Sequence, residues 1–221
     1  AQPQERLDHT RKKPLTHTES HTLRRPGYAA LAKQILLHDV ISFDIFDTLL
    51  FRPFDDPTAV FYLVGEKLHV PSFTRYRVLA EKQARQKAKE RTGYNEVTLS
   101  DIYTQLQRYV ACDIEKAMRI ECETELSLLK ANPYMKQVYQ MALEMGKTLM
   151  SDMYLPGDVL RQALEQNGYT HFTRVFLSQE CGFSKRSGKL FPFVKQEMGL
   201  DKRYLHLGDS PIADRVRPRR A

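Results

Sequence analysis

The stretch Val40-Ile41-Ser42-Phe43-Asp44-Ile45-Phe46-Asp47-Thr48 decides the fold. Its first four residues form an apolar run with the length of a short buried strand, and the run leads directly into Asp44. Open α/β sheets bind their ligands at the carboxyl ends of the strands. The pattern therefore predicts a nucleophilic Asp44 at a sheet edge, with Asp47 and Thr48 beside it as further site candidates.

The rest of the chain predicts an α/β fold with a large helical insertion. After this first strand, helical patterns continue for about a hundred residues; strands are then expected at 147–151, 175–178 and 204–208, separated by helices at 157–167 and 190–198. Such alternation indicates a parallel sheet with right-handed crossovers.

This pattern divides the chain into a sheet domain and an insertion. We assign residues 28–51 and 147–221 to the sheet domain and residues 52–146 to the insertion, which follows the first strand and is placed to cover the strand ends. Within the insertion, Thr98 and Asp101 predict a helix-capping box, and the acidic run Glu121, Glu123, Glu125 predicts a solvated helix face.

The charge distribution argues against a nucleic-acid partner. The net charge is +7, but the surplus of Lys and Arg lies in residues 1–27 and 214–221, and the first of these segments is expected to be a flexible basic arm. No apolar run has the length of a membrane span, and the three cysteines form no C-x-x-C motif, as in a cytoplasmic protein with reduced thiols.

Two more predicted strands end on residues that suit phosphate chemistry. One runs into Ser151-Asp152 and the last into Gly208-Asp209-Ser210, with Asp214 further on. Parallel strands bring these ends to one edge of the sheet, beside Asp44. An aspartate can attack a phosphoryl group, and Mg²⁺, a hard ion with oxygen ligands, would relieve the repulsion between carboxylates and phosphate.

The four motifs together resemble those of the haloacid dehalogenase (HAD) superfamily. They are, in order, Phe43–Leu50, Leu149–Ser151, Lys185, and Gly208–Asp214, and the insertion resembles that superfamily's helical C1-type cap. The resemblance implies a Rossmann-like core and a metal site in which Asp44, the carbonyl of Phe46 and Asp209 bind Mg²⁺ while Asp214 orients the metal's shell.

The resemblance also implies the groups that hold the substrate. Ser151 would bind the phosphoryl group, and Lys185 would balance its charge, with Lys189 as the fallback for that role. Further candidates for contact with the small phosphorylated substrate are Thr48, Asp152 and Arg52.

Phe46 departs from the pattern of phosphatases in this superfamily. Their residue at this position is usually an aspartate that protonates the leaving oxygen and later activates water. Phe46 does neither, which leaves three interpretations. In the first, the protein is a phosphohydrolase in which Asp47 or Asp152 replaces the missing acid, or in which the leaving group needs no proton. In the second, it is a catalytically weak domain that binds a ligand or organises a larger enzyme. In the third, it is a 2-haloacid dehalogenase. Because dehalogenation requires no metal, the pair Asp209 and Asp214 favours phosphate.

The exact residues of the first two motifs indicate a particular subgroup of the superfamily. Ser42–Leu50 with Ser151-Asp-Met-Tyr-Leu-Pro resembles a bacterial subgroup associated with, or fused to, glycosyltransferases of surface-polysaccharide synthesis. The strand that normally follows the last motif is not contained in the sequence, so we expect either a shortened chain or one that continues into a longer protein.

Overall fold

The computed structural model describes residues 26–143, 146–151 and 153–220, with the backbone alone for 146–151. The predicted basic arm lies outside these residues apart from its last two positions, as do Asp152 and the side chain of Ser151.

The predicted parallel sheet is confirmed. Its strands are β1 (Val40–Phe43), β4 (Gly146–Ser151), β5 (Arg174–Leu177) and β6 (Tyr204–Leu207), in the order β5-β4-β1-β6. The register pairs the last residue of β1 with Leu149 on one side and Leu207 on the other. The residues that follow these strands therefore meet at one edge of the sheet.

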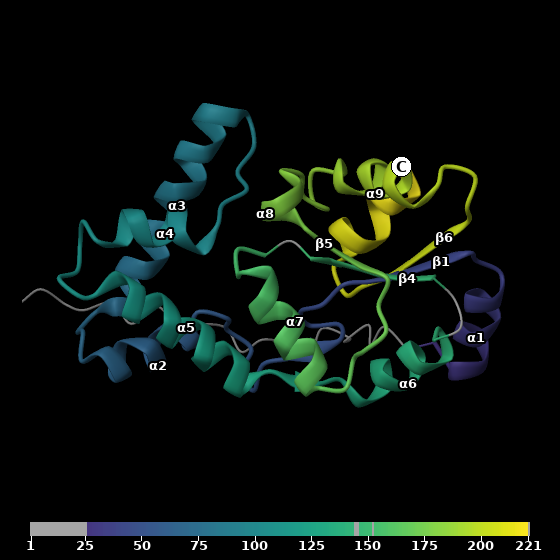
Figure 1. Ribbon diagram of the computed structural model, residues 1–221, viewed down its shortest axis with the longest axis horizontal. Helices are drawn as coiled ribbons and strands as arrows, with labels where there is room; N and C mark the ends of the chain where they lie inside the picture. Colours follow the sequence, from purple (N-terminus) through teal and green to yellow (C-terminus); the bar gives the residue numbers. More distant parts are fainter. Residues whose placement is uncertain (1–25, 144–145, 152, 221) are drawn as a thin grey trace, which may run out of the picture.

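Helices cover both faces of this sheet (Figure 1). One face packs on α1 (Tyr28–Leu36), α6 (Pro133–Met141) and α7 (Gly157–Gln166), which bury apolar residues against Ile41 and Phe43 of β1. On the other face α9 (Leu190–Met198) packs Phe191 and Val194 against Phe176 of β5. The short helix α8 (Ser178–Cys181) follows β5, and the chain continues after β6 into a π-helical turn (Pro211–Val216) and a 3₁₀ turn (Pro218–Arg220).

The part of the segment between β1 and β4 that precedes α6 forms a separate group of helices at the carboxyl edge of the sheet (Figure 1). These are α2 (Ala59–Leu68), α3 (Phe73–Thr92), α4 (Leu99–Leu106) and α5 (Ile114–Leu128). The chain enters and leaves the group through an antiparallel pair that the sequence pattern did not predict, β2 (Leu50–Phe51) and β3 (Lys130–Ala131). The Thr98–Asp101 capping box at the start of α4 is confirmed.

The prediction of a solvated acidic face on α5 was wrong for Glu121 and Glu125 and is confirmed only for Glu123, which is exposed. The side chains of Glu121 and Glu125 are 0% and 1% exposed. Arg77 of α3 donates to both oxygens of Glu121, at 2.9 and 2.8 Å, and Arg52 donates to both oxygens of Glu125. Two arginines from distant positions thus neutralise carboxylates that would otherwise be too costly to bury.

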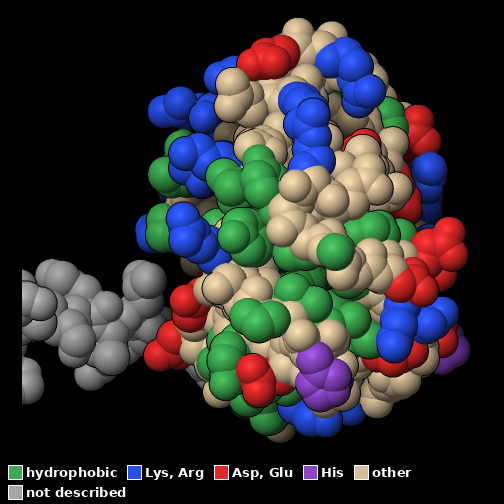
Figure 2. All heavy atoms as spheres, turned by 90° about the vertical axis from the view of Figure 1, so that its left-hand side faces the viewer, with side chains coloured by type: hydrophobic (Ala, Val, Ile, Leu, Met, Phe, Trp, Pro, Cys, Tyr) green, Lys and Arg blue, Asp and Glu red, His purple; other side chains and the backbone are tan. Residues whose placement is uncertain are grey.

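At the end of the molecule formed by the inserted helices, the described residues show no block of one charge. Figure 2 looks at this end, where basic and acidic side chains are interspersed with apolar ones. Within the part of the chain that the structure describes, no helix combines the length and the apolar character needed to cross a membrane.

Candidate active site

Asp44 lies where β1 ends, with its carboxylate fixed by the surrounding protein. Its backbone N–H donates to the carbonyl of Leu207, which continues the pairing of β1 with β6. Its Oδ1 accepts hydrogen bonds from the backbone of Ile45 at 2.8 Å and forms an ion pair with Lys185 Nζ at 2.7 Å. Burial raises the pKa of Asp44 to about 7, against the opposing charge of Lys185. Both of these contacts are made by Oδ1.

Lys185 bridges two carboxylates at the sheet edge. Its Nζ lies 2.7 Å from Asp44 Oδ1 and 2.7 Å from Asp214 Oδ1, and the residue is 2% exposed. Burial disfavours the ammonium form, but the charges of Asp44 and Asp214 outweigh it and raise the pKa of Lys185. The structure thus provides a charged lysine at the predicted nucleophile.

Asp214 is held on both of its oxygens. Oδ1 contacts Lys185 and His206 Nε2, the latter at 2.9 Å, and Oδ2 accepts from the backbone N–H of Ser210 at 3.0 Å. Burial opposes its ionisation, yet the hydrogen bond from His206 and the charge of Lys185 hold the pKa of Asp214 below its usual range. With its oxygens engaged, Asp214 suits an orienting role better than direct coordination of a metal.

His206 is a site residue that the sequence reasoning missed. Its ring lies between Asp214 and Ser42, whose Oγ is 2.8 Å from Nδ1, and its edge meets the ring of Phe191. The available signal was its place in the predicted last strand, next to β1, where a buried imidazole needs polar partners on both nitrogens.

The carboxylates of Asp44, Asp209 and Asp214 form a cluster that could hold a cation. One oxygen from each lies within 4.8 Å of the others. Asp209 is exposed, and its Oδ1 accepts from Thr48 Oγ1 at 3.2 Å. Oxygen donors of this kind fit Mg²⁺, which takes one or two carboxylates and keeps several waters.

The turn after Asp44 presents the backbone of Phe46 to the same place. The N–H of Leu50 donates to the carbonyl of Ile45, and the carbonyl of Leu50 accepts from the N–H of Asp47. These two hydrogen bonds therefore involve the residues on either side of Phe46. The turn requires a left-handed Asp47, with φ of 56°, a conformation that aspartate tolerates better than most residues. The carbonyl of Phe46 stays outside this exchange and suits the predicted ligand role.

A cavity of about 490 Å³ opens at this edge, between the sheet and the inserted helices. The sheet side contributes Asp44, Asp47, Lys185 and Asp209, together with Arg186. The insertion contributes Arg52, Pro57, Thr58, Phe61 and Glu81, and the sheet domain also contributes Phe46, Met153, Tyr154, Ser210 and Ala213. The cavity therefore has charged groups of both signs around a small volume, as in a site for a polar ligand.

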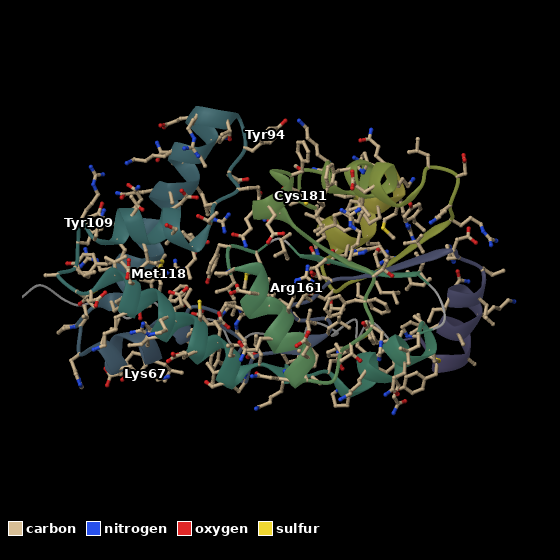
Figure 3. The ribbon with its side chains drawn as sticks, viewed as in Figure 1. Lys67, Tyr94, Tyr109, Met118, Arg161 and Cys181 are labelled. Carbon is tan, nitrogen blue, oxygen red and sulfur yellow. The ribbon has the colours of Figure 1, made fainter. Side chains whose placement is uncertain are left out.

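Two predicted substrate contacts lie elsewhere. Thr48 is buried and supports Asp209, and it is absent from the described lining of the cavity. Lys189 donates to the hydroxyl of Tyr94 at 2.7 Å, and the Tyr94 ring meets Phe183 edge-on. Figure 3 shows Tyr94 in the loop after α3. This contact joins the tip of the insertion to the sheet domain. The side chain of Ser151 and the whole of Asp152 lie outside the described residues.

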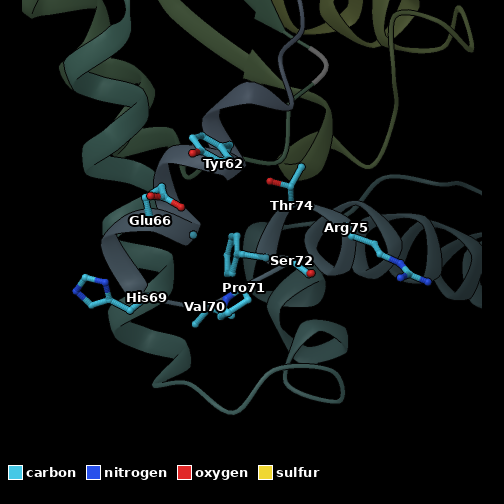
Figure 4. Close-up of a pocket in the computed structure, with 10 residues that line it drawn as sticks. Tyr62, Glu66, His69, Val70, Pro71, Ser72, Thr74 and Arg75 are labelled. Carbon is cyan, nitrogen blue, oxygen red and sulfur yellow. The ribbon is translucent and has the colours of Figure 1, made fainter.

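A larger cavity, of about 660 Å³, lies at the turn between α2 and α3 (Figure 4). Its described lining runs from Tyr62 to Arg75 and contains none of the predicted site residues. His69 and Ser72 in this turn adopt left-handed backbone conformations, with φ of 54° and 61°. Its size alone does not make it the reactive site, because it lacks the convergent carboxylates and lysine of the sheet edge.

Solved structures that are similar to this fold include HAD hydrolases. The chain is similar to the putative HAD hydrolase YfnB of Bacillus subtilis, bound to magnesium (18% identity, 83% of this chain and 85% of that one, TM-score 0.57). It is also similar to a 2-haloacid dehalogenase of Pseudomonas syringae (13% identity, 83% of each chain, TM-score 0.58). A third similar structure is a HAD-family enzyme of Bacteroides thetaiotaomicron (14% identity, 82% of this chain and 89% of that one, TM-score 0.56).

These similarities define the class to which the fold belongs. No protein-family model matches the chain, and no match was found among curated proteins. The chain has the fold of HAD-superfamily hydrolases, and the predicted resemblance is confirmed at the level of the fold.

Proposed function

We propose that the protein is a Mg²⁺-dependent phosphohydrolase that acts on a small phosphorylated metabolite or phosphosugar through an aspartyl-phosphate intermediate. The observation that carries the proposal is the cluster at the sheet edge. Asp44, Asp209 and Asp214 have oxygens within 4.8 Å of one another, and Lys185 lies 2.7 Å from Asp44. The magnesium in the similar YfnB structure supports the metal assignment.

In the proposed reaction, Asp44 acts as the nucleophile. One oxygen of its carboxylate attacks phosphorus, the bond from phosphorus to the leaving oxygen breaks, and that oxygen departs with the electron pair. Lys185 fixes the attacking carboxylate and offsets the negative charge of the transferring group. A Mg²⁺ held by Asp44, Asp209 and the Phe46 carbonyl would neutralise phosphate oxygens and lower the repulsion between anions.

The second step returns the enzyme to its starting state. Water attacks the phosphorus of the aspartyl phosphate, the bond to Asp44 breaks with its electron pair returning to the carboxylate, and inorganic phosphate leaves. Asp47 is the carboxylate that we assign to accept the proton of this water, because it is exposed and lines the cavity beside Asp44.

Two observations favour a second candidate, a 2-haloacid dehalogenase. Phe46 provides no proton donor, and similar structures include dehalogenases. The oxygen cluster favours phosphate, since carbon–halogen cleavage by an aspartate needs no metal.

A panel of sugar phosphates, nucleotides and acyl phosphates, assayed with and without Mg²⁺, tests the proposal. We expect Mg²⁺-dependent phosphate release that disappears in Asp44→Asn, while Asp113→Asn, a change at the N-cap of α5, retains it. Chloride release from a 2-haloacid in the presence of a chelator, without activity on any phosphate, would instead establish the dehalogenase.

A further inference from the structure

Arg52 places a fixed cation on the ring of Phe46. Its guanidinium carbon lies 4.5 Å from the centroid of that ring, and its Nε and Nη2 both donate to Glu125 at 3.0 Å. The side chains of Arg52 and Glu125 are 6% and 1% exposed. Three contacts thus determine the orientation of the guanidinium, and both Arg52 and Phe46 line the cavity that contains Asp44.

This arrangement is costly to bury. Burial raises the pKa of Glu125, and the hydrogen bonds and charge of Arg52 counteract that rise. A buried pair of this kind is weak evidence for stability, since apolar residues of similar volume often serve a core as well. What the pair provides is a preorganised positive charge at the wall of the cavity.

One edge of the guanidinium remains available to a ligand. Glu125 engages Nε and Nη2, whereas Nη1 makes no hydrogen bond or ion pair with any residue that the structure describes. Because a guanidinium has five N–H donors and stays protonated in proteins, it can donate hydrogen bonds to an anion but cannot release a proton to it.

We propose that Arg52 stabilises the departing oxygen as an anion, in the place where an aspartate would protonate it. The inference rests on the proposed phosphohydrolase function. When the bond from phosphorus to the leaving oxygen breaks, both electrons stay on that oxygen. Arg52 hydrogen-bonds the resulting oxyanion, which takes its proton from water after it has left the site.

The proposal defines a class of substrate. A cation without a transferable proton assists oxygens that are already stable as anions, as in acyl phosphates, phosphoanhydrides and anomeric sugar phosphates. A simple alkyl phosphate, whose alkoxide is a strong base, gains too little from Arg52 to react well. The specificity of the site is therefore set by the acidity of the leaving group, with shape as a second filter.

The experiment measures kcat/KM with Mg²⁺ for aryl phosphates of graded leaving-group pKa and for one alkyl phosphate. The variants are Arg52→Gln, the charge-removing pair Arg52→Gln with Glu125→Gln, and the exposed control Arg174→Gln. Circular dichroism and a melting curve establish that each variant is folded. If Arg52→Gln alone does not fold, the double variant is used for the kinetic comparison, because it leaves no unpaired buried carboxylate.

We expect the parent to slow steeply as the leaving-group pKa rises. Loss of Arg52 should cost about 10²–10³-fold on the poorest leaving groups and progressively less on better ones, as for removal of an oxyanion donor. Arg174→Gln should follow the parent. An equal loss across the series would overturn the role of Arg52 while leaving the phosphohydrolase intact. Failure of the parent on every phosphate would overturn the proposed function, and this inference with it.

Discussion

Removal of Arg77 is expected to lower the stability of the protein strongly. It is fully buried on α3, donates to Glu121 at 2.9 and 2.8 Å, and donates to Glu81 at 3.1 Å. Its guanidinium also lies over the rings of Phe61 and Tyr154, 4.4 and 4.9 Å from their centroids. Arg77 therefore links α3 to α5 and to the segment that follows β4.

Replacing Arg77 with Met keeps the volume but leaves Glu121 buried with a single remaining partner. That partner is the Tyr103 hydroxyl, which donates to Glu121 at 2.8 Å. Removing one member of a buried ion pair costs about 3–5 kcal/mol. In a chain of this size each kcal/mol lowers the melting temperature by about 2–4 °C, so we expect a fall of about 6–20 °C.

Urea unfolding followed by circular dichroism measures this change directly. Arg77→Met with Glu121→Leu removes both charges and should recover most of the lost stability, since Tyr103 keeps the carbonyl of Ala117 as an acceptor at 3.2 Å. Arg174→Met, which breaks an exposed pair with Glu197, is the matched control and should change stability by less than about 1 kcal/mol. The reasoning is refuted if Arg77→Met also stays within about 1 kcal/mol of the parent, or if the double variant is no more stable than the single one.

Three further predictions concern the site and its surroundings. Lys185→Met removes the cation that two buried carboxylates share and should lower stability by about 3–5 kcal/mol, of which Mg²⁺ should restore part. Melting curves with and without the ion check this, and an identical loss in both would contradict the metal site. Tyr94→Phe removes the hydrogen bond from Lys189 and should raise KM more than it lowers kcat. Equal changes of the two constants in a steady-state assay would argue against a role for this contact in holding the insertion on the sheet domain. Burial raises the pKa of Cys122 to about 12, so its thiolate should be scarce at pH 8 and its alkylation slow. Alkylation at pH 8 as fast as that of a small free thiol would refute the burial.

The sheet and the position of Asp44 could be predicted because their signals are local. A short apolar run that ends on a polar residue indicates a buried strand and its carboxyl end, and parallel pairing then brings distant strand ends together. Asp44 and Asp209 lie at strand ends, where this logic expects them, and Lys185, which only the family resemblance indicated, lies 2.7 Å from Asp44. The β2–β3 pair escaped prediction because strands of two residues carry no periodicity.

The buried acids of α5 could not be predicted in this way. A run of glutamates on a helix is normally solvated. Glu121 and Glu125 can be buried because they pair with arginines that lie 44 and 73 residues away in the sequence. No local sequence pattern indicates either pairing. The same limitation hid the stacking of Arg52 on Phe46, so the sequence revealed the missing acid but not the cation beside it.

A single turnover in ¹⁸O-labelled water, with enzyme in excess over a reactive phosphate ester, tests the central claim most directly. If Asp44 forms an aspartyl phosphate and water attacks phosphorus, mass spectrometry should find the label in the released phosphate, none in Asp44, and no turnover in Asp44→Asn. Label incorporated into the Asp44 carboxylate, or phosphate release that persists in Asp44→Asn, would contradict the account.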